Sequence, residues 1–158
     1  MPDKNEVIDD LDFKILSKLV VNADRPYTDI AKELYVSGGT IHVRIKKLKK
    51  LGIIKRALLD IDYHKLGYDV TAFLGVYLEK SSQYETVASI LRTIPEIVDA
   101  HYTTGNYSIF AKIICRDTKH LKEILSDRIQ PIQGVQRTET FISLQESINR
   151  PLQIPDKE

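Results

Sequence analysis

A dense run of basic residues lies in the first half of the chain. Seven lysines and arginines fall between Arg44 and Arg56, and no acidic residue occurs between Glu33 and Asp60. The first sixty residues carry 12 Lys+Arg against 9 Asp+Glu, whereas the remainder carries 11 against 13. A local excess of positive charge favours a surface that faces phosphate groups. The alternative is a solvated helix face without a partner.

Two classes of residue in and around this run suit two kinds of contact with DNA. Residues early in a helix can reach base edges, which gives specificity, and other cations can neutralise phosphates, which gives salt-dependent affinity. The first class comprises Ser37, Gly38, Gly39, His42, Val43 and Lys46. The second class comprises Arg44, Lys47, Lys50, Lys55 and Arg56. Thr28 and Thr40 complete the predicted DNA-binding set.

Three short helices are predicted to position the DNA-binding set. The first has an apolar stripe at helical spacing, and the second begins at Thr28, a residue type that often caps helices. The third opens at Ser37 and ends near Gly52, because glycine is a common C-terminal cap. Residues 53–61 are apolar and β-branched enough to form a short strand, or wing. A tight turn followed by a basic helix indicates a winged helix-turn-helix in residues 1–61.

Gly38 and Gly39, at the start of the third helix, allow two interpretations. A glycine costs about 1 kcal/mol inside a helix but much less at a cap, and we favour a cap position for both. The alternative is that their bare backbone lets the helix approach the DNA closely.

The rest of the chain is predicted to alternate strands with two helices. Strands are expected at residues 70–78, 97–103, 108–115 and 135–144, and helices at 82–93 and 118–128. The order β-α-β-β-α-β is that of a ferredoxin-like domain, so the fold class is α+β. The predicted organisation is a helix-turn-helix domain at 1–61, a linker at 62–69, the ferredoxin-like domain at 70–149 and a tail at 150–158.

The two predicted helices leave one face of the predicted sheet uncovered. This face carries Phe73 and Tyr77, which are too apolar to remain exposed. Pairing with a second copy of the chain is the simplest way to bury them, and two-fold pairing is the commonest form of assembly. We therefore predict a dimer.

Several motifs together resemble the leucine-responsive regulator/AsnC, or feast-famine, family of transcriptional regulators. In the first domain they are LDFKIL at 11–16, DIAKELYVS at 29–37, RIKKL at 44–48 and LGII at 51–54. Further along they are KLGY at 65–68, TGNY at 104–107, GV at 134–135 and TET at 138–140. The resemblance covers about residues 7–149, which is nearly the whole chain.

The resemblance implies an oligomeric, sequence-specific regulator that binds double-stranded DNA, forming dimers and then octamers or larger assemblies. It implies no cofactor, but an amino acid or similar effector bound in a cleft between dimers. The residues that match this cleft are Tyr102, Thr104, Gly105, Asn106, Tyr107, Ser108, Gln133, Gly134, Val135, Thr138 and Thr140. The alternative role for the loop residues among them is a well-formed hairpin that contacts another subunit.

The remaining reactive residue types form no evident catalytic or metal site. The four histidines lack metal-ligand spacing, and Cys115, the single cysteine, is expected to be a buried apolar residue. One cysteine, an acidic N-terminus and no apolar run of eighteen residues favour a cytoplasmic protein that contacts no membrane. Two alternative functions stay open: an architectural DNA-binding protein without an effector, and a decarboxylase-type enzyme on the same fold. The basic helix argues against the enzyme.

Overall fold

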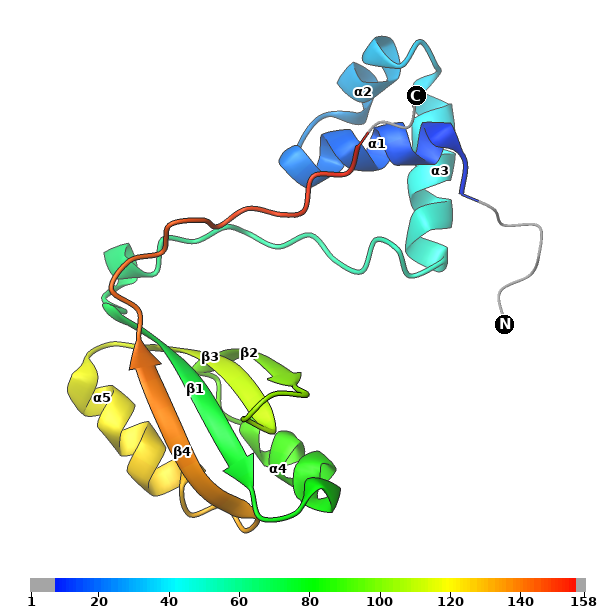
Figure 1. The fold of residues 1–158 in the computed structure, drawn as a ribbon. Helices are drawn as coiled ribbons and strands as arrows, with labels where there is room; N and C mark the ends of the chain where they lie inside the picture. The colour runs from blue at the N-terminus through cyan, green and yellow to red at the C-terminus, as the bar shows by residue number, and fades with distance from the viewer. Residues whose placement is uncertain (1–7, 156–158) are drawn as a thin grey trace. The chain divides into compact units, whose positions relative to one another are not determined.

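A computed structural model describes residues 8–155 of the chain, which divide into two compact units (Figure 1). The first unit extends to Asp60 and includes the chain from Ile148 onward, and the second runs from Ile61 to Ser147. The predicted linker, 62–69, belongs with the second unit and contains a short 3-10 helix, η1 (His64–Leu66). Of the predicted first domain and tail, residues 1–7 and 156–158 lie outside the described residues.

Three helices form the first unit: α1 (Asp10–Val21), α2 (Tyr27–Glu33) and α3 (Gly38–Lys50). α1 begins with a capping box, in which the Asp9 and Asp12 side chains each accept a hydrogen bond from the other residue's backbone N–H. The buried side chains that pack the helices together are Ile15, Ile30, Ala31, Ile41 and Ile45. Their helical spacing in the sequence is what buries one side of each helix.

Two local predictions for this unit are wrong. α2 begins at Tyr27, and its N-cap residue Pro26 supplies no side-chain acceptor, so Thr28 lies within the first turn instead of capping it. Proline suits this position because its φ is already close to the helical value. Residues 53–61 form no strand. The N–H groups of Ile53 and Ile54 instead bond to the Leu48 carbonyl, which closes the end of α3.

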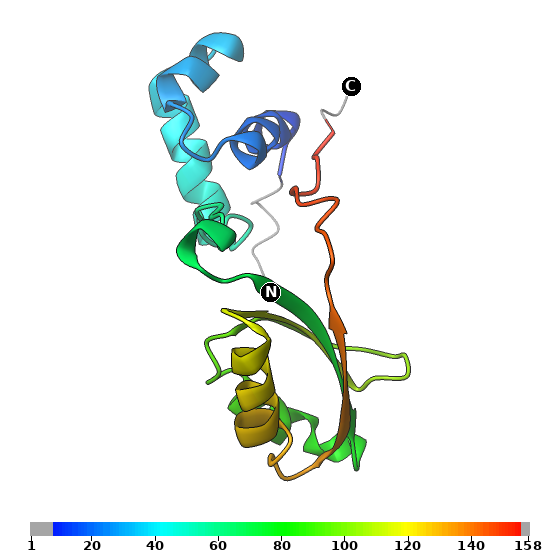
Figure 2. The same cartoon turned by 90° about the vertical axis from the view of Figure 1, so that its left-hand side faces the viewer.

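The second unit is a four-stranded antiparallel sheet in the order β2-β3-β1-β4. Its strands are β1 (Val70–Leu78), β2 (Ile97–Tyr102), β3 (Ile109–Cys115) and β4 (Val135–Ile142). Its helices are α4 (Tyr84–Leu91), which follows the 3-10 turn η2 (Ser81–Gln83), and α5 (Thr118–Glu123), which continues as the π-helical η3 (Ile124–Ile129). Figures 1 and 2 show α4 and α5 on the same side of the sheet. The predicted α+β, ferredoxin-like order of elements is therefore confirmed.

The central strand β1 separates the two faces of this sheet. Its Ala72, Leu74 and Val76 are fully buried with the core that α4 and α5 cover. Phe73 and Tyr77 alternate with them and are only half-buried. The face that the alternation predicted to be bare is therefore the face without helices.

Candidate functional site

The N-terminus of α3 is capped by Ser37. Its Oγ accepts a hydrogen bond from the Thr40 backbone N–H at 3.0 Å, and the two hydroxyl groups lie 2.9 Å apart. The predicted cap position for Gly38 and Gly39 is therefore wrong: Ser37 is the cap, and both glycines lie in the first turn of the helix. Beyond its own helix and chain neighbours, no atom of the described chain lies within 4 Å of the position that a Cβ on Gly38 would take.

We expect Gly38→Ala to raise the free energy of unfolding by about 0.4–1 kcal/mol, because alanine loses less backbone freedom on folding. Affinity for DNA should stay unchanged, since Ser37 caps the helix and no described side chain requires a bare backbone at Gly38. Thermal unfolding and gel-shift titrations test both expectations. Gly52→Ala is the control, because the φ of 71° at Gly52 strains any larger residue. A fall in DNA affinity without a loss of stability would show that the bare backbone is required.

One face of α3 is open to solvent within the first unit. Ile41, Ile45 and Leu48 are buried on its other side. The exposed residues of the helix are Gly38, Gly39, His42, Val43, Lys46, Lys49 and Lys50. Val43 is 66% exposed, so the unit leaves an apolar side chain among cationic ones. A stripe of this composition can contact phosphates, base-edge acceptors and thymine methyl groups in a major groove.

Arg44 and Lys47 do not belong to this open face. Asp12, which is fully buried, receives the Lys47 ammonium at 2.8 Å and the Arg44 guanidinium at 3.4 Å. Arg44 also forms a close ion pair with Asp9. The sequence predicted phosphate contacts for both cations, whereas the structure pairs both with carboxylates at the start of α1. We call Asp9, Asp12, Arg44 and Lys47 the α1–α3 clasp.

The clasp shifts the titration of two of its members. Burial acts to raise the pKa of Asp9, but the Asp12 backbone N–H and the Arg44 guanidinium lower this pKa overall. The hydrogen bond to Asp9 raises the pKa of Arg44. A carboxyl whose pKa is lowered by folding stabilises the fold above its unfolded pKa. That contribution from Asp9 is therefore lost as the pH falls through its folded pKa.

The other residues of the predicted DNA-binding set lie outside α3 or at its end. Thr28 is exposed in the first turn of α2. Lys55 and Arg56 are exposed in the segment after α3, which has no regular secondary structure. Both cations remain candidates for phosphate contacts.

Tyr35, in the turn between α2 and α3, is an exposed residue that sequence analysis missed. Its ring is 95% exposed, and its φ of 53° is in the left-handed region, which costs a non-glycine residue about 1–2 kcal/mol. The turn is held by the Val36 N–H, which donates to the Ala31 carbonyl at 2.9 Å. No sequence signal would have found this conformation, because tyrosine does not favour it.

In the second unit, part of the predicted effector set lies in the β2–β3 hairpin. The exposed tip consists of Thr104, Gly105 and Asn106. Below the tip, the Thr103 hydroxyl donates a close hydrogen bond to the Tyr107 carbonyl. The Ser108 N–H donates to the Val76 carbonyl at 2.9 Å, which ties the loop to β1. The tip therefore projects from a firmly held base.

The rest of the predicted effector set lies at β4, the opposite edge of the sheet from β2. Thr138 and Thr140 pair with Val76 and Leu74, so they share the helix-covered side of the sheet. The Thr138 hydroxyl accepts a hydrogen bond from the Gln130 amide at 3.4 Å. Gln133 and Gly134 lie in the turn before β4, and Val135 is the first residue of that strand. The two threonines thus face the helix-covered side of β4, whereas Tyr107 of the hairpin bonds to Glu139 on the open side.

The open side of the sheet carries a cluster that we call the aromatic face: Phe73, Tyr77, Tyr107, Phe110 and Phe141. Phe73 and Phe110 stack with their ring centroids 5.9 Å apart. The Tyr107 ring lies against Gly75, where a Cβ would come within 2.4 to 2.7 Å of it. Sequence analysis named only Phe73 and Tyr77, although the alternation of the later strands would have placed Phe110 and Phe141 here.

Glu139 is the hydrogen-bond and ion-pair partner of the polar groups on the aromatic face. It accepts hydrogen bonds from the hydroxyl groups of Tyr107, at 2.8 Å, and Tyr77, at 3.2 Å. It also pairs closely with Arg137, whose guanidinium carbon lies 3.5 Å from the centre of the Tyr77 ring. The Tyr107 hydrogen bond and then the Arg137 contact lower the pKa of Glu139. Because these polar groups are paired with one another, the face can be covered without leaving them unsatisfied.

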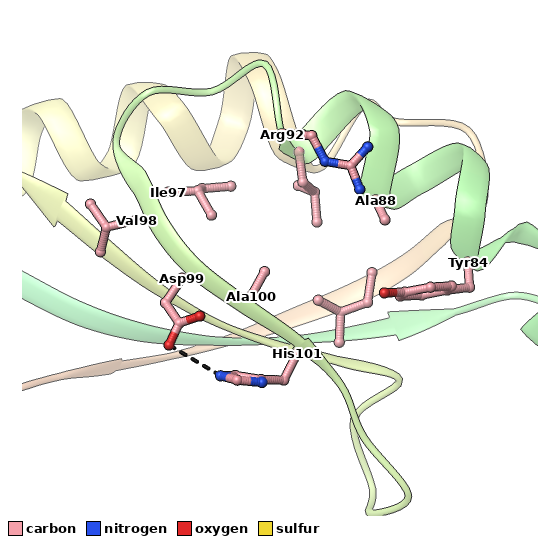
Figure 3. Close-up of a pocket in the computed structure, with 10 residues that line it drawn as sticks. Tyr84, Ala88, Arg92, Ile97, Val98, Asp99, Ala100 and His101 are labelled. Atoms are coloured by element: carbon pink, nitrogen blue, oxygen red, sulfur yellow. Dashed lines mark hydrogen bonds and ion pairs between the residues drawn. The ribbon is translucent and has the colours of Figure 1, made fainter. Parts of the chain in front are cut away.

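A cavity of about 270 Å³ lies between α4 and β2 (Figure 3). None of the predicted effector residues lines this cavity. One predicted effector residue, Tyr102, contacts the cavity wall from outside: its ring stacks on that of the lining residue Tyr84, with the centroids 4.2 Å apart. Sequence analysis missed the cavity, because it depends on the small residues Ala88 and Ala100 on separate elements.

The described residues hold neither a reactive cysteine nor a metal-binding cluster. Cys115 is buried at the end of β3, and burial raises the pKa of its thiol to about 11, as expected for an unreactive cysteine. Within residues 8–155, no group of three or more His, Cys, Asp or Glu side chains is arranged to hold a metal ion. None of the helices in that range is both long and apolar enough to cross a bilayer.

Two family models match the chain. One, described as the Lrp/AsnC ligand binding domain, matches residues 71–152, and the other, a winged helix-turn-helix DNA-binding model, matches residues 8–55. The chain is 47% identical over 145 residues to the regulatory protein AsnC of Haemophilus influenzae, covering 92% of this chain and 97% of that protein. It is 44% identical over 149 residues to the AsnC protein of Escherichia coli K12, covering 94% and 98%.

Solved structures show the same fold. The structure of E. coli AsnC has a TM-score of 0.87 and 43% identity, and the similarity covers 93% of this chain and 99% of that chain. A transcriptional regulator of Neisseria meningitidis, solved as a complex with L-Met, has a TM-score of 0.87 over 94% of this chain and 97% of its own. At 21% identity, this second likeness concerns the fold alone.

Proposed function

Since this chain belongs to the Lrp/AsnC family of DNA-binding transcriptional regulators, we propose that the exposed face of α3 reads its operator. The observation that carries this proposal is the stripe of His42, Val43 and Lys46, which faces away from the buried side of the helix. His42 and Lys46 can donate to base-edge acceptors, and Val43 can contact a thymine methyl group. Like these relatives, which are regulatory proteins, the chain is a regulator and not an enzyme.

Phosphate contacts are assigned to cations at and beyond the end of α3. Lys50, Lys55 and Arg56 are exposed and follow the base-reading stripe along the chain. Contacts of this kind add salt-dependent affinity for any DNA sequence. Arg44 and Lys47 are given a different role, because the clasp uses their charges to hold α3 against α1.

The aromatic face supports the proposal of a dimer. Five aromatic side chains share this side of the sheet, and Phe141 at its edge is still 48% exposed in one subunit. Burying such rings against a second copy is favourable, because each aromatic side chain removes a large apolar area from water. A dimer would present two copies of α3 to successive turns of the duplex. Such a regulator would act in the cytoplasm, together with the DNA that it binds.

An amino acid or a similar small molecule is the proposed effector of the second unit. Support comes from the family model on residues 71–152, which is that of a ligand binding domain. The exposed backbone at Gly105 and the amide of Asn106 offer donors and acceptors for a carboxylate and an ammonium. Because Thr138 faces the helix-covered side of the sheet while Tyr107 of the hairpin packs on the open side, we propose that copies of the chain complete this effector site together.

Footprinting of the full-length protein on the DNA around its own gene tests the regulator function. We expect two or more protected half-sites on one face of the duplex, separated by one helical turn or a multiple of it. The proposal would fail if the affinity for every DNA tested stayed at non-specific strength.

Lys46→Ala is expected to weaken binding to the preferred site by about tenfold or more, because a good base contact gives about 1–3 kcal/mol of discrimination. Binding to random DNA should change much less. Arg56→Ala should instead weaken binding to all DNA alike and reduce the salt slope by about 1. Competition gel shifts at several salt concentrations compare both variants with Lys122→Ala, an exposed change in the second unit. Equal losses for Lys46→Ala on both kinds of DNA would contradict its role in base recognition.

Thermal melts with each of the twenty amino acids test the effector proposal. A ligand that binds only the folded state must raise the melting temperature in a concentration-dependent way. If no amino acid does so, an architectural DNA-binding protein without an effector becomes the better description of the chain.

A further inference from the structure

We propose that the cavity between α4 and β2 is a binding site, within one subunit, for a small carboxylic acid with an apolar side chain. This site is separate from the effector site proposed between subunits, because none of those predicted residues lines the cavity. The proposal therefore does not depend on that effector site, or on how copies of the chain assemble.

The size and walls of the cavity suit a compact apolar group. A volume of about 270 Å³ equals that of roughly nine molecules of liquid water, which is the size range of a leucine or a methionine. Leu91, Ile97 and Ile109 supply apolar wall. Ala88 and Ala100 also line the cavity, and their short side chains leave the space between helix and strand unfilled. An apolar side chain in this space would leave water for a preformed pocket.

Arg92 supplies a cation for the acidic group. It is the C-cap residue of α4 and lines the cavity, where Figure 3 shows its guanidinium beside Ala88. No ion pair joins Arg92 to a carboxylate of the described residues. A guanidinium binds a carboxylate with two parallel hydrogen bonds, so a ligand carboxylate would complete this group.

The other two acidic or basic residues that line the cavity, Asp99 and His101, are not paired with Arg92. Asp99 and His101 pair with each other at 3.1 Å, and in Figure 3 both point to the side of β2 away from α4. The Tyr84 ring stands at one end of the cavity, backed by its stacked neighbour Tyr102. The cavity thus combines some apolar wall, one aromatic end and one cation, Arg92, that is paired with none of the described carboxylates.

The edge strand β2 adds backbone polar groups. It pairs only with β3, so one side of its backbone has no neighbouring strand. Unpaired N–H and C=O groups along such an edge can bond to a ligand that lies beside it. An amino acid could use a free carbonyl for its ammonium, whereas a simple carboxylic acid would rely on Arg92 alone.

Isothermal titration of the full-length protein with three probes tests the proposal. We expect isocaproate or L-leucine to bind, and L-leucinamide, which has the same side chain but no carboxylate, not to bind. Arg92→Gln should weaken binding by about tenfold to a hundredfold, since the pair is charge-assisted, and Arg92→Lys should recover part of the loss. Ala100→Leu should fill the cavity and abolish binding without lowering the melting temperature of the free protein.

Two further variants serve as controls. Arg116→Gln makes the same charge change at an exposed position that does not line the cavity, so it should bind the probes normally. Asn106→Ala alters the hairpin tip and should also leave this binding intact. The proposal is overturned if neither acid binds, or if Asn106→Ala abolishes binding while Ala100→Leu keeps it. It is also overturned if Ala100→Leu changes the oligomeric state, because the cavity would then hold part of another copy. A failure of the regulator function would appear separately, as non-specific binding to every DNA.

Discussion

Asp12→Asn is expected to lower the free energy of unfolding of the first unit by about 1.5–3 kcal/mol, because it removes the buried carboxylate that pairs with the Lys47 ammonium and the Arg44 guanidinium. The carboxylate that it removes is fully buried and lies 2.8 Å from the Lys47 ammonium. Asparagine is nearly the same size, so the loss reports the charge and not the packing. Small domains have only about 5–15 kcal/mol of stability, so a sizeable share of the stability of this unit would disappear.

Thermal and urea unfolding followed by circular dichroism measure this loss, and the second unit should keep its own transition. Glu33→Gln is the matched control, because Glu33 pairs with Lys18 and Arg25 at the surface and should have a much smaller effect. In the double variant Asp12→Asn with Lys47→Gln, part of the loss should be recovered, because one unpaired charge is gone. Strictly additive losses would show that Asp12 and Lys47 do not act as a pair.

The loss of the Asp12 carboxylate should also weaken specific DNA binding at temperatures where Asp12→Asn still folds. Together with the buried Ile41 and Ile45, the clasp holds α3 in the orientation in which His42 and Lys46 face outward. A helix held less firmly presents these two residues only part of the time, so apparent affinity falls with the competent fraction. Gel shifts at low temperature would detect this loss. Normal specificity in Asp12→Asn would assign the clasp a role in stability alone.

Phe73→Glu is expected to weaken the proposed dimer by about a thousandfold or more, because pairing would bury an uncompensated carboxylate. Phe73 is half-buried at the centre of the aromatic face, stacked on Phe110 and paired in register with Phe141. Glu139 lies on the same face and is ionised, so the new carboxylate also meets a like charge there. A single subunit should tolerate the change, since this side of its sheet is already open to water.

Sedimentation velocity over a range of protein concentrations measures the dimer. Phe73→Leu is the control, because it keeps an apolar side chain at the same place and should assemble nearly as the parent protein does. Footprints of Phe73→Glu should shrink from paired half-sites to weak or absent protection. A monomeric parent protein, or a Phe73→Glu variant that assembles normally, would rule out the aromatic face as the dimer interface.

Local periodicity made much of the fold predictable. The alternation along residues 70–78 gave β1 its bounds and its two faces, since strand side chains point to opposite sides in turn. Ser37 indicated the start of α3, because a serine hydroxyl can cap the free N–H groups at the beginning of a helix. Residues 53–61 also looked like a strand, but that prediction failed, because a strand needs a neighbour and the described residues of the first unit supply none.

Only the tertiary structure showed which cations of α3 face solvent and which pair with α1. In the sequence, Lys46 and Lys47 are adjacent lysines of the same basic run. They differ because a helix turns about 100° per residue, and that step brings Lys47 beside a carboxylate of α1 while Lys46 stays in solvent. Asp12 lies 35 residues earlier than Lys47, so no local pattern links the two.

In the second unit, too, some features followed from the sequence and others only from the tertiary structure. By itself, the sequence determined the order of strands and helices and the apolar character of the uncovered face. The tertiary structure decided that Tyr107 joins that face, since this loop residue fits only because Gly75 has no side chain. It also decided that Ala88 and Ala100 line one cavity with Arg92. Both outcomes depend on how distant segments align, and short-range periodicity carries no information about such alignment.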